Sequence, residues 1–298
     1  MTQRLHPENA LKVVLSGVYD DQQQDNNIDA PFVRVRNGNI SYIYLDSSYT
    51  NSITPANIIL GVNGGDLFTR RLNRIAVKGI SMSWVTPNIN PRNDTLTFSV
   101  GGSTYTTTMT DTYYDTVDLL FNSLASAMTS TSGTTFTATN TSVNVGVNSY
   151  ILAATASAPF TIIGGNMVAQ GQFMFGWIPT DSRVGVPVTS FILTNTSLQY
   201  TRFINLNSFL LTQYSKLPSS GIDTLGTNIV KVYLDNDLFI DRTIFFNILQ
   251  PLAWINFNST ASITTVDLQI FDEWNQLLYI PPGFQNSFYV SIILMGEL

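Results

Sequence analysis

The stretch "LQIFDEWNQLLYIPPGFQNSFYVSIILMGEL", residues 268–298, has the pattern of a strand, a turn and a second strand. The second strand is apolar on both faces, since Phe288, Val290, Ile292 and Leu294 alternate with Tyr289, Ile293 and Met295. Successive side chains of a strand point to opposite faces. We therefore expect one face to fill the core, and the other to need cover from insertion loops or from a neighbouring subunit.

Strand patterns recur from residue 31 onward. Asn37-Gly38 and Gly101-Gly102 each separate two alternating segments, which predicts two-residue hairpins. In "RIAVKGISMSW", residues 74–84, the alternation changes phase at Gly79, which indicates a β-bulge. Many short strands with Pro and Gly breaks, and no internal repeat, predict an all-β chain: an antiparallel jelly-roll β-sandwich of two sheets, with one short helix and loop insertions.

The short helix is predicted over residues 116–128. Its apolar stripe has the spacing i, i+3, i+4, i+7 and i+11, made by Val117, Leu120, Phe121, Leu124 and Met128. Asp115 is the expected N-cap, Asp118 favours the first turn, and Gly133 follows the end.

The chain divides into two predicted parts. Residues 1–30 contain "YDDQQQDNNIDA", which is polar, acidic and without period, so they are expected to form a flexible N-terminal arm. Residues 31–298 are expected to form one jelly-roll domain with insertions.

The composition points to an assembly. Charged residues make up 11% of the 298 residues, against about 25% in an ordinary soluble domain. A chain with so little charge either hides much of its surface in an assembly or forms a large neutral β-sandwich. The net charge of −6 excludes a basic, sequence-specific nucleic-acid binder. No run of 18 apolar residues and no signal peptide is found, so no membrane span is expected.

The residues needed for common active sites are missing. His6 is the single histidine and there is no cysteine, which argues against triad, thiol and zinc chemistry. The segment 25–30 lacks the glycine of a calcium loop, and Asp272 and Glu273 are adjacent in a strand context, so they do not form a catalytic pair. We predict no catalytic, cofactor-binding or metal site, and no enzyme activity.

Four segments carry a resemblance to a known family. They are "NRIAVKGISMSW" (73–84), "NDTLTFSVGGSTYTTTMTDTYYDTVDLLFNSLASAM" (93–128), "TATNTSVNVGVNSYILAATASAPFTIIGG" (137–165) and "VDLQIFDEWNQLLYIPPGFQNSFYVSIIL" (266–294). In pattern and order, over about residues 73–294, they resemble the penton, or minor capsid, proteins of virophages and polinton-like double-stranded DNA viruses. That family is built on a single jelly roll.

The resemblance implies a structural protein that forms homopentamers at icosahedral five-fold vertices, with the major capsid protein of the same virus as partner. The expected location is the virion, assembled in the host cytoplasm or a virus factory. A second reading is a jelly-roll spike protein that binds a receptor or a carbohydrate, with Trp177, Tyr200 or Trp254 lining a groove.

Overall fold

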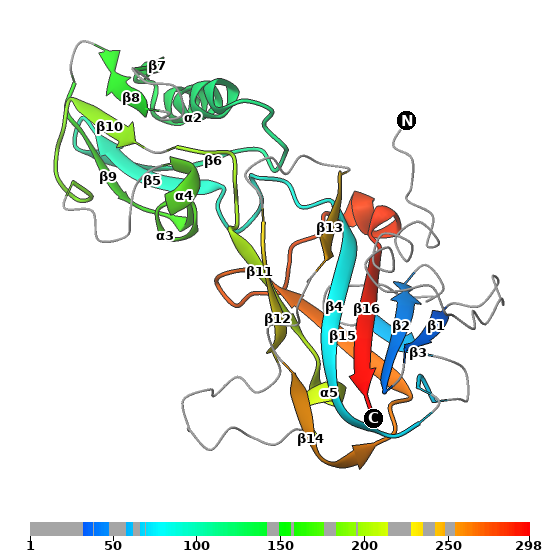
Figure 1. Cartoon of the computed structure of the whole chain (residues 1–298). Helices are drawn as coiled ribbons and strands as arrows, with labels where there is room; N and C mark the ends of the chain where they lie inside the picture. The colour runs from blue at the N-terminus through cyan, green and yellow to red at the C-terminus, as the bar shows by residue number, and fades with distance from the viewer. Residues whose placement is uncertain are drawn as a thin grey trace. The chain divides into compact units, whose positions relative to one another are not determined.

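The computed structural model describes twelve stretches of the chain (Figure 1): residues 32–37, 39–47, 58–61, 66–68, 70–141, 149–155, 158–175, 183–194, 196–213, 228–234, 242–247 and 254–298. The expected arm, residues 1–30, lies outside them. The division into an arm and a single domain over residues 31–298 therefore stays a prediction.

The chain forms two compact units. Unit 1 comprises Met1–Val85, Phe203–Tyr233 and Asp241–Leu298, and unit 2 comprises Thr86–Arg202 and Leu234–Ile240. Most of unit 2 is thus the segment between strands β4 and β11, and a second, short segment follows strand β12.

Unit 1 contains two antiparallel sheets. The six-stranded sheet has the order β1-β2-β16-β4-β13, and β14 also pairs with β4. Its strands are β1 Phe32–Asn37, β2 Ile40–Asp46, β4 Leu72–Trp84, β13 Arg242–Asn247, β14 Ile255–Ala261 and β16 Val290–Glu297. The four-stranded sheet, β12-β11-β15-β3, is made of β3 Ile58–Gly61, β11 Phe203–Asn207, β12 Asn228–Tyr233 and β15 Thr265–Phe271. The helices among the described residues of the unit are α5 Phe209–Thr212 and the 3₁₀ helix η3 Pro282–Ser287.

The strand order of unit 1 is that of a jelly roll. Eight strands form the jelly roll, and in chain order they are β2, β3, β4, β11, β12, β13, β15 and β16. One sheet has the order β2-β16-β4-β13, which are the first, eighth, third and sixth of these strands. The other has the order β12-β11-β15-β3, which are the fifth, fourth, seventh and second. This is the double Greek key of a jelly roll, and the predicted fold class is confirmed.

Strand β16 lies at the centre of the larger sheet, between β2 and β4 (Figure 1). Both of its faces are buried within the chain: Val290, Ile292 and Leu294 on one, Ile293 and Met295 on the other. On the second face, Ile293 and Met295 lie beside their cross-strand partners Tyr44 and Tyr42 of β2, and Ile40 and Trp254 pack against this cluster. The face that was expected to need cover is therefore buried without a neighbouring subunit.

The bulge predicted at Gly79 is present in β4. Ile293 of β16 pairs with Gly79 and Leu294 pairs with Val77, so Lys78 is the extra residue. Because of this extra residue, Ile75 and Val77 lie on the same face as Ile80 and Met82, opposite successive inward residues of β16. The phase change in the sequence thus keeps the apolar residues of β4 on one continuous face. In a strand without the bulge, the same residues would be divided between two faces.

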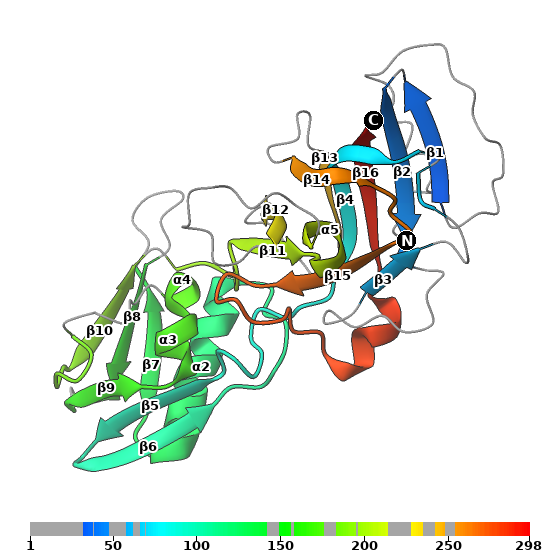
Figure 2. The ribbon, with the colours of Figure 1, turned by 90° about the horizontal axis from the view of Figure 1, so that it is seen from below.

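Unit 2 contains two three-stranded antiparallel sheets, with the orders β6-β5-β9 and β10-β8-β7 (Figure 2). The strands are β5 Thr95–Val100, β6 Ser103–Thr108, β7 Phe136–Asn140, β8 Ser149–Ala154, β9 Phe160–Gly164 and β10 Ser190–Thr194. The helices are α2 Val117–Ser132, α3 Asn166–Gln170 and α4 Gln172–Phe175. Gly101 and Gly102 have φ angles of 61° and 80°, as a two-residue turn between β5 and β6 requires, so this hairpin is confirmed.

An aromatic core joins the elements of unit 2. The Phe136 ring lies edge-on to Phe98 at 5.5 Å and to Phe160 at 5.2 Å, measured between ring centroids. Phe121 of α2 stacks on Tyr150 of β8 at 4.5 Å. Strands from both sheets and the helix therefore share one interior.

Helix α2 confirms the predicted stripe and corrects its cap. Leu120, Phe121, Leu124 and Met128 are fully buried. The N-cap is Thr116 and not Asp115, because the Thr116 hydroxyl accepts a hydrogen bond from the Leu119 amide at 3.2 Å.

Candidate functional site

Among the described residues, no group of three or more His, Cys, Asp and Glu side chains could hold a metal ion. His6 and the acidic segments 25–30 and 235–241 lie outside the described residues. Within the described part of the chain, no helix has the length and apolar composition to cross a bilayer.

The adjacent acids Asp272 and Glu273 belong to a turn after β15. The buried Asp272 carboxylate accepts hydrogen bonds from the amides of Trp274 at 3.0 Å and Gln276 at 2.9 Å. Asn275, with a φ of 58°, completes the turn. The Asp272 carboxylate therefore holds this turn together, and the strand context expected for the two acids is wrong, since β15 ends at Phe271.

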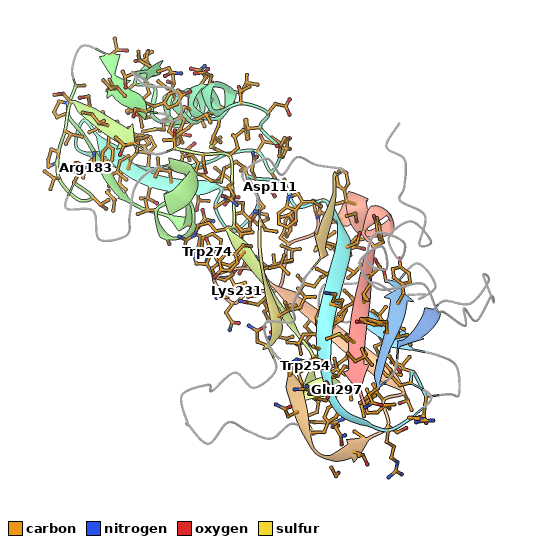
Figure 3. All side chains as sticks on the ribbon, in the orientation of Figure 1. Asp111, Arg183, Lys231, Trp254, Trp274 and Glu297 are labelled. Atoms are coloured by element: carbon orange, nitrogen blue, oxygen red, sulfur yellow. The ribbon has the colours of Figure 1, made fainter. Side chains whose placement is uncertain are left out.

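The aromatic residues proposed for a glycan groove do not form an exposed platform in the described structure. Tyr200 is 3% exposed. Trp254 is partly buried against the cluster beneath β16, and the Arg74 guanidinium lies 4.3 Å from its ring centroid. Figure 3 shows Trp254 and Glu297 close together, and Glu297 binds the same arginine at 2.6 Å. Trp177 lies outside the described residues.

The strands of unit 2 carry no ionised side chain. None of the residues in β5 to β10 is Asp, Glu, Lys or Arg. This is unusual even for a chain with 11% charged residues, because solvent-exposed sheets commonly carry charges that keep them apart from other sheets. The outer faces of the two sheets are therefore the candidate functional surfaces of the unit.

We call the outer face of β6-β5-β9 the threonine face. Every one of its side chains is exposed or half-buried, and it comprises Thr95, Thr97, Ser99, Thr104, Thr106, Thr108, Thr161 and Ile163. Thr97 and Thr106 sit opposite each other, with their hydroxyl oxygens 3.1 Å apart. Ile163, 45% exposed, is the extra residue of a bulge in β9.

We call the outer face of β10-β8-β7 the isoleucine face. It comprises Thr137, Thr139, Ser149, Ile151, Ala153, Ser190, Ile192 and Thr194, all exposed or half-buried. Ile192 is 49% exposed and pairs with Ile151 of the central strand. The opposite face carries Tyr150, Leu152, Phe191 and Leu193, which fill the core.

A single cation lies beside this sheet. Arg183 donates a hydrogen bond to the carbonyl oxygen of Ile192 at 2.6 Å, and its guanidinium carbon lies 4.5 Å from the Phe191 ring centroid. The arginine thereby occupies a main-chain acceptor of β10 and places a charge beside this strand. Charges placed in this way disfavour pairing with a further strand.

Three of the described acids of unit 2, Asp111, Asp115 and Asp118, are exposed around the start of α2. Burial and the nearby Asp94 raise the pKa of Asp111. The Tyr150 hydroxyl donates to the Asp118 carboxylate at 2.7 Å, and burial together with this hydrogen bond raises the pKa of Tyr150. None of these three acids belongs to the strands that form the threonine and isoleucine faces.

Unit 1 differs in its exposed apolar residues. Tyr233 of β12 is 66% exposed and lies against Phe203, with the Lys231 ammonium 4.1 Å from the Phe203 ring centroid. This aromatic pair sits on the outer face of the four-stranded sheet and is mixed with charge. Sequence reasoning did not find the uncharged faces of unit 2, although the absence of charge from six consecutive strands was a visible signal.

No protein-family model and no curated protein sequence matches this chain. Several solved structures are similar, among them two from virophages. The crystal structure of the mavirus penton protein matches over 86% of this chain and 99% of its own, with 14% identity and a TM-score of 0.50. The cryo-electron-microscopy structure of the Sputnik virophage contains a chain that matches over 86% of this one and 97% of its own, with 14% identity and a TM-score of 0.39.

The likeness to the mavirus penton protein is a likeness of fold. It extends over nearly the whole of that protein and most of this chain. The resemblance to virophage penton proteins seen in the sequence pattern is confirmed at the level of fold.

Proposed function

We propose that this chain is a viral capsid protein, and specifically a penton protein that forms homopentamers at the five-fold vertices of an icosahedral particle. The observation that carries the proposal is the jelly-roll strand order of unit 1, combined with the similarity to a penton protein over 99% of that protein's length. The low proportion of charged residues supports it, because assembled subunits hide surface that would otherwise need charges.

The proposed partners are further copies of this chain and the major capsid protein of the same virus, and the proposed location is the virion. A ring of five uses heterologous contacts, in which two different sides of each subunit meet. A structural role of this kind needs no catalytic residues. The proposal therefore also includes the absence of enzyme activity.

Cryo-electron microscopy of the particle tests the proposal directly. We expect density for this chain around the five-fold axes, with five copies at each vertex. Density at three-fold positions, or on fibres that project from the particle, would contradict the penton assignment and favour the alternative of a receptor- or carbohydrate-binding spike.

A further inference from the structure

We propose that unit 2 supplies a ring contact, in which the threonine face of one copy packs on the isoleucine face of the next. The inference rests on the proposed function, because it names the surfaces that join the subunits. It goes beyond that function in assigning the contact to unit 2, whose two uncharged faces give the two different sides that a heterologous contact needs.

Charge is the first argument for a second copy as the occupant. The chain has a net charge of −6, so copies repel each other wherever their acidic surfaces approach. Protein interfaces are depleted of charged residues at their cores. The threonine and isoleucine faces contain no acid, while Asp111, Asp115 and Asp118 lie at the start of α2. Two acidic copies can therefore meet through these faces without a like-charge penalty.

The side chains on the faces are the second argument. Thr and Ile are β-branched, so their χ1 angles are already restricted in a strand. Burying them costs less conformational entropy than burying long flexible side chains. Each face also carries one well-exposed large apolar residue, Ile163 on the threonine face and Ile192 on the isoleucine face. These two isoleucines are the apolar anchors of the proposed contact.

The strand edge is the third argument, because it favours a contact through the faces. Arg183 already occupies the carbonyl oxygen of Ile192, which disfavours extension of the sheet by another strand. As a cation in an acidic chain, Arg183 does not add to the repulsion between copies.

Disulfide trapping tests the contact, since the chain has no cysteine of its own. The variant Ile163→Cys/Ile192→Cys carries one thiol on each face. Under oxidation at high protein concentration, we expect a ladder of covalent oligomers on a non-reducing gel. Each single variant should stay monomeric, because in a heterologous contact a residue does not meet its own copy.

The matched control is Leu119→Cys/Ile192→Cys. Leu119 is 53% exposed, in the same unit, but lies on α2 away from both faces. This variant should give no ladder. A dimer from either single variant, or an equal ladder from the control, would overturn the inference.

A charge exchange gives a second readout that does not depend on thiol chemistry. Ile163→Glu and Ile192→Lys should each reduce oligomer formation by at least about tenfold, because each places one unpaired charge in the contact. Both changes in the same chain place opposite charges in each contact and should restore assembly, with a dependence on salt. Failure of the double variant to assemble better than the single variants would count against the pairing of these two faces.

Electron microscopy of the unmodified protein under the same conditions separates the two proposals. The absence of a ladder overturns the inference whether or not rings are seen. Five-membered rings without a ladder leave the proposed function standing with its contacts elsewhere. A ladder that accompanies rings of another size supports the contact and overturns the pentamer.

Discussion

The two units differ in the charge carried by their strands and in how the faces of their sheets are buried. In unit 1, ionised residues occur within the strands, among them Arg74, Lys78, Lys231, Asp267 and Glu297, and both faces of the central strand β16 are buried. In unit 2, the six strands carry no charge, and each sheet is buried on one face only. The jelly roll completes its central sheet within one chain, while unit 2 leaves two neutral faces open. A low count of charged residues over the whole chain therefore does not distinguish the two units, whereas the position of the uncharged residues does.

The largest expected effect comes from a charge in the core of unit 2. Leu120 of α2 is fully buried, so Leu120→Asp leaves an unpaired carboxylate there. We expect a loss of more than about 4 kcal/mol in the free energy of unfolding. Hydrogen exchange should show lost protection in β5 to β10, while β2, β4 and β16 keep theirs.

The adjacent residue provides the control for this substitution. Leu119 is 53% exposed, so Leu119→Asp should change stability by no more than about 0.5 kcal/mol. Equal loss of protection in both units after Leu120→Asp would mean that the units unfold together.

A substitution in the core of the other unit, Gly296→Val in β16, should destabilise unit 1. A Cβ atom at Gly296 would lie 2.7 Å from Leu72 Cδ1 and 2.9 Å from Phe68 Cε1, and both neighbours are buried. Gly296→Val should therefore cost about 1–3 kcal/mol through overpacking, with protection lost in β2, β4 and β16. At Gly283 a Cβ meets nothing within 4 Å, so an effect of Gly283→Val as large as that of Gly296→Val would refute the steric explanation.

A smaller effect is expected from the tyrosine that joins β8 to α2. Tyr150→Phe removes the hydrogen bond to Asp118 and should cost about 1 kcal/mol at pH 8. The pKa of Tyr150 is raised above 10.0 in the folded protein, so its contribution to stability is complete below pH 10 and is lost as the pH rises further. In urea denaturation, the difference between the unmodified protein and the variant should narrow above pH 10. A difference that grows with pH would have the wrong sign.

The smallest effect is expected from the ion pair of unit 1. The Arg74 and Glu297 side chains are 38% and 31% exposed, and such pairs contribute at most about 1 kcal/mol. Glu297→Gln should lower stability by no more than that, and less in 1 M salt, where charges are screened. A loss above about 2 kcal/mol in thermal unfolding would show that charge is as important to the jelly roll as its apolar packing.

Local patterns allowed much of the fold to be predicted. The bulge beside Gly79 and the stripe of α2 follow from periodicities that are written in neighbouring residues. The predicted N-cap of α2 was wrong because Asp115 and Thr116 are both good capping residues, and only the backbone conformation at the start of the helix selects between them. The cluster around Ile293 and Met295 could not be predicted, since its other members, Tyr42, Tyr44 and Trp254, are residues that no sequence pattern connects to β16.

The candidate surfaces were missed for a related reason. Charge was counted over the whole chain, whereas the faces appear only when alternate residues of β5 to β10 are placed side by side by pairing. The separation into two compact units was missed with them, because the run of uncharged strands β5 to β10, all in unit 2, is averaged out in the composition of the whole chain.

The central position of β16 has a consequence for synthesis on the ribosome. The amide of Tyr289, directly before β16, donates a hydrogen bond to the hydroxyl of Ser83 in β4, which lies 206 residues earlier in the chain. At a translation rate of roughly 5–20 residues per second, β16 is therefore synthesised about 10 to 40 s after β4. Unit 2 has far shorter connections, for instance the 81 residues between Asn93 and Met174, and can fold while the chain still grows. During that time the apolar face of β4, with Ile75, Val77, Ile80 and Met82, has no strand β16 beside it. The nascent chain is therefore most prone to aggregation late in translation, and a factor that shields β4 during this interval should raise the yield of native protein.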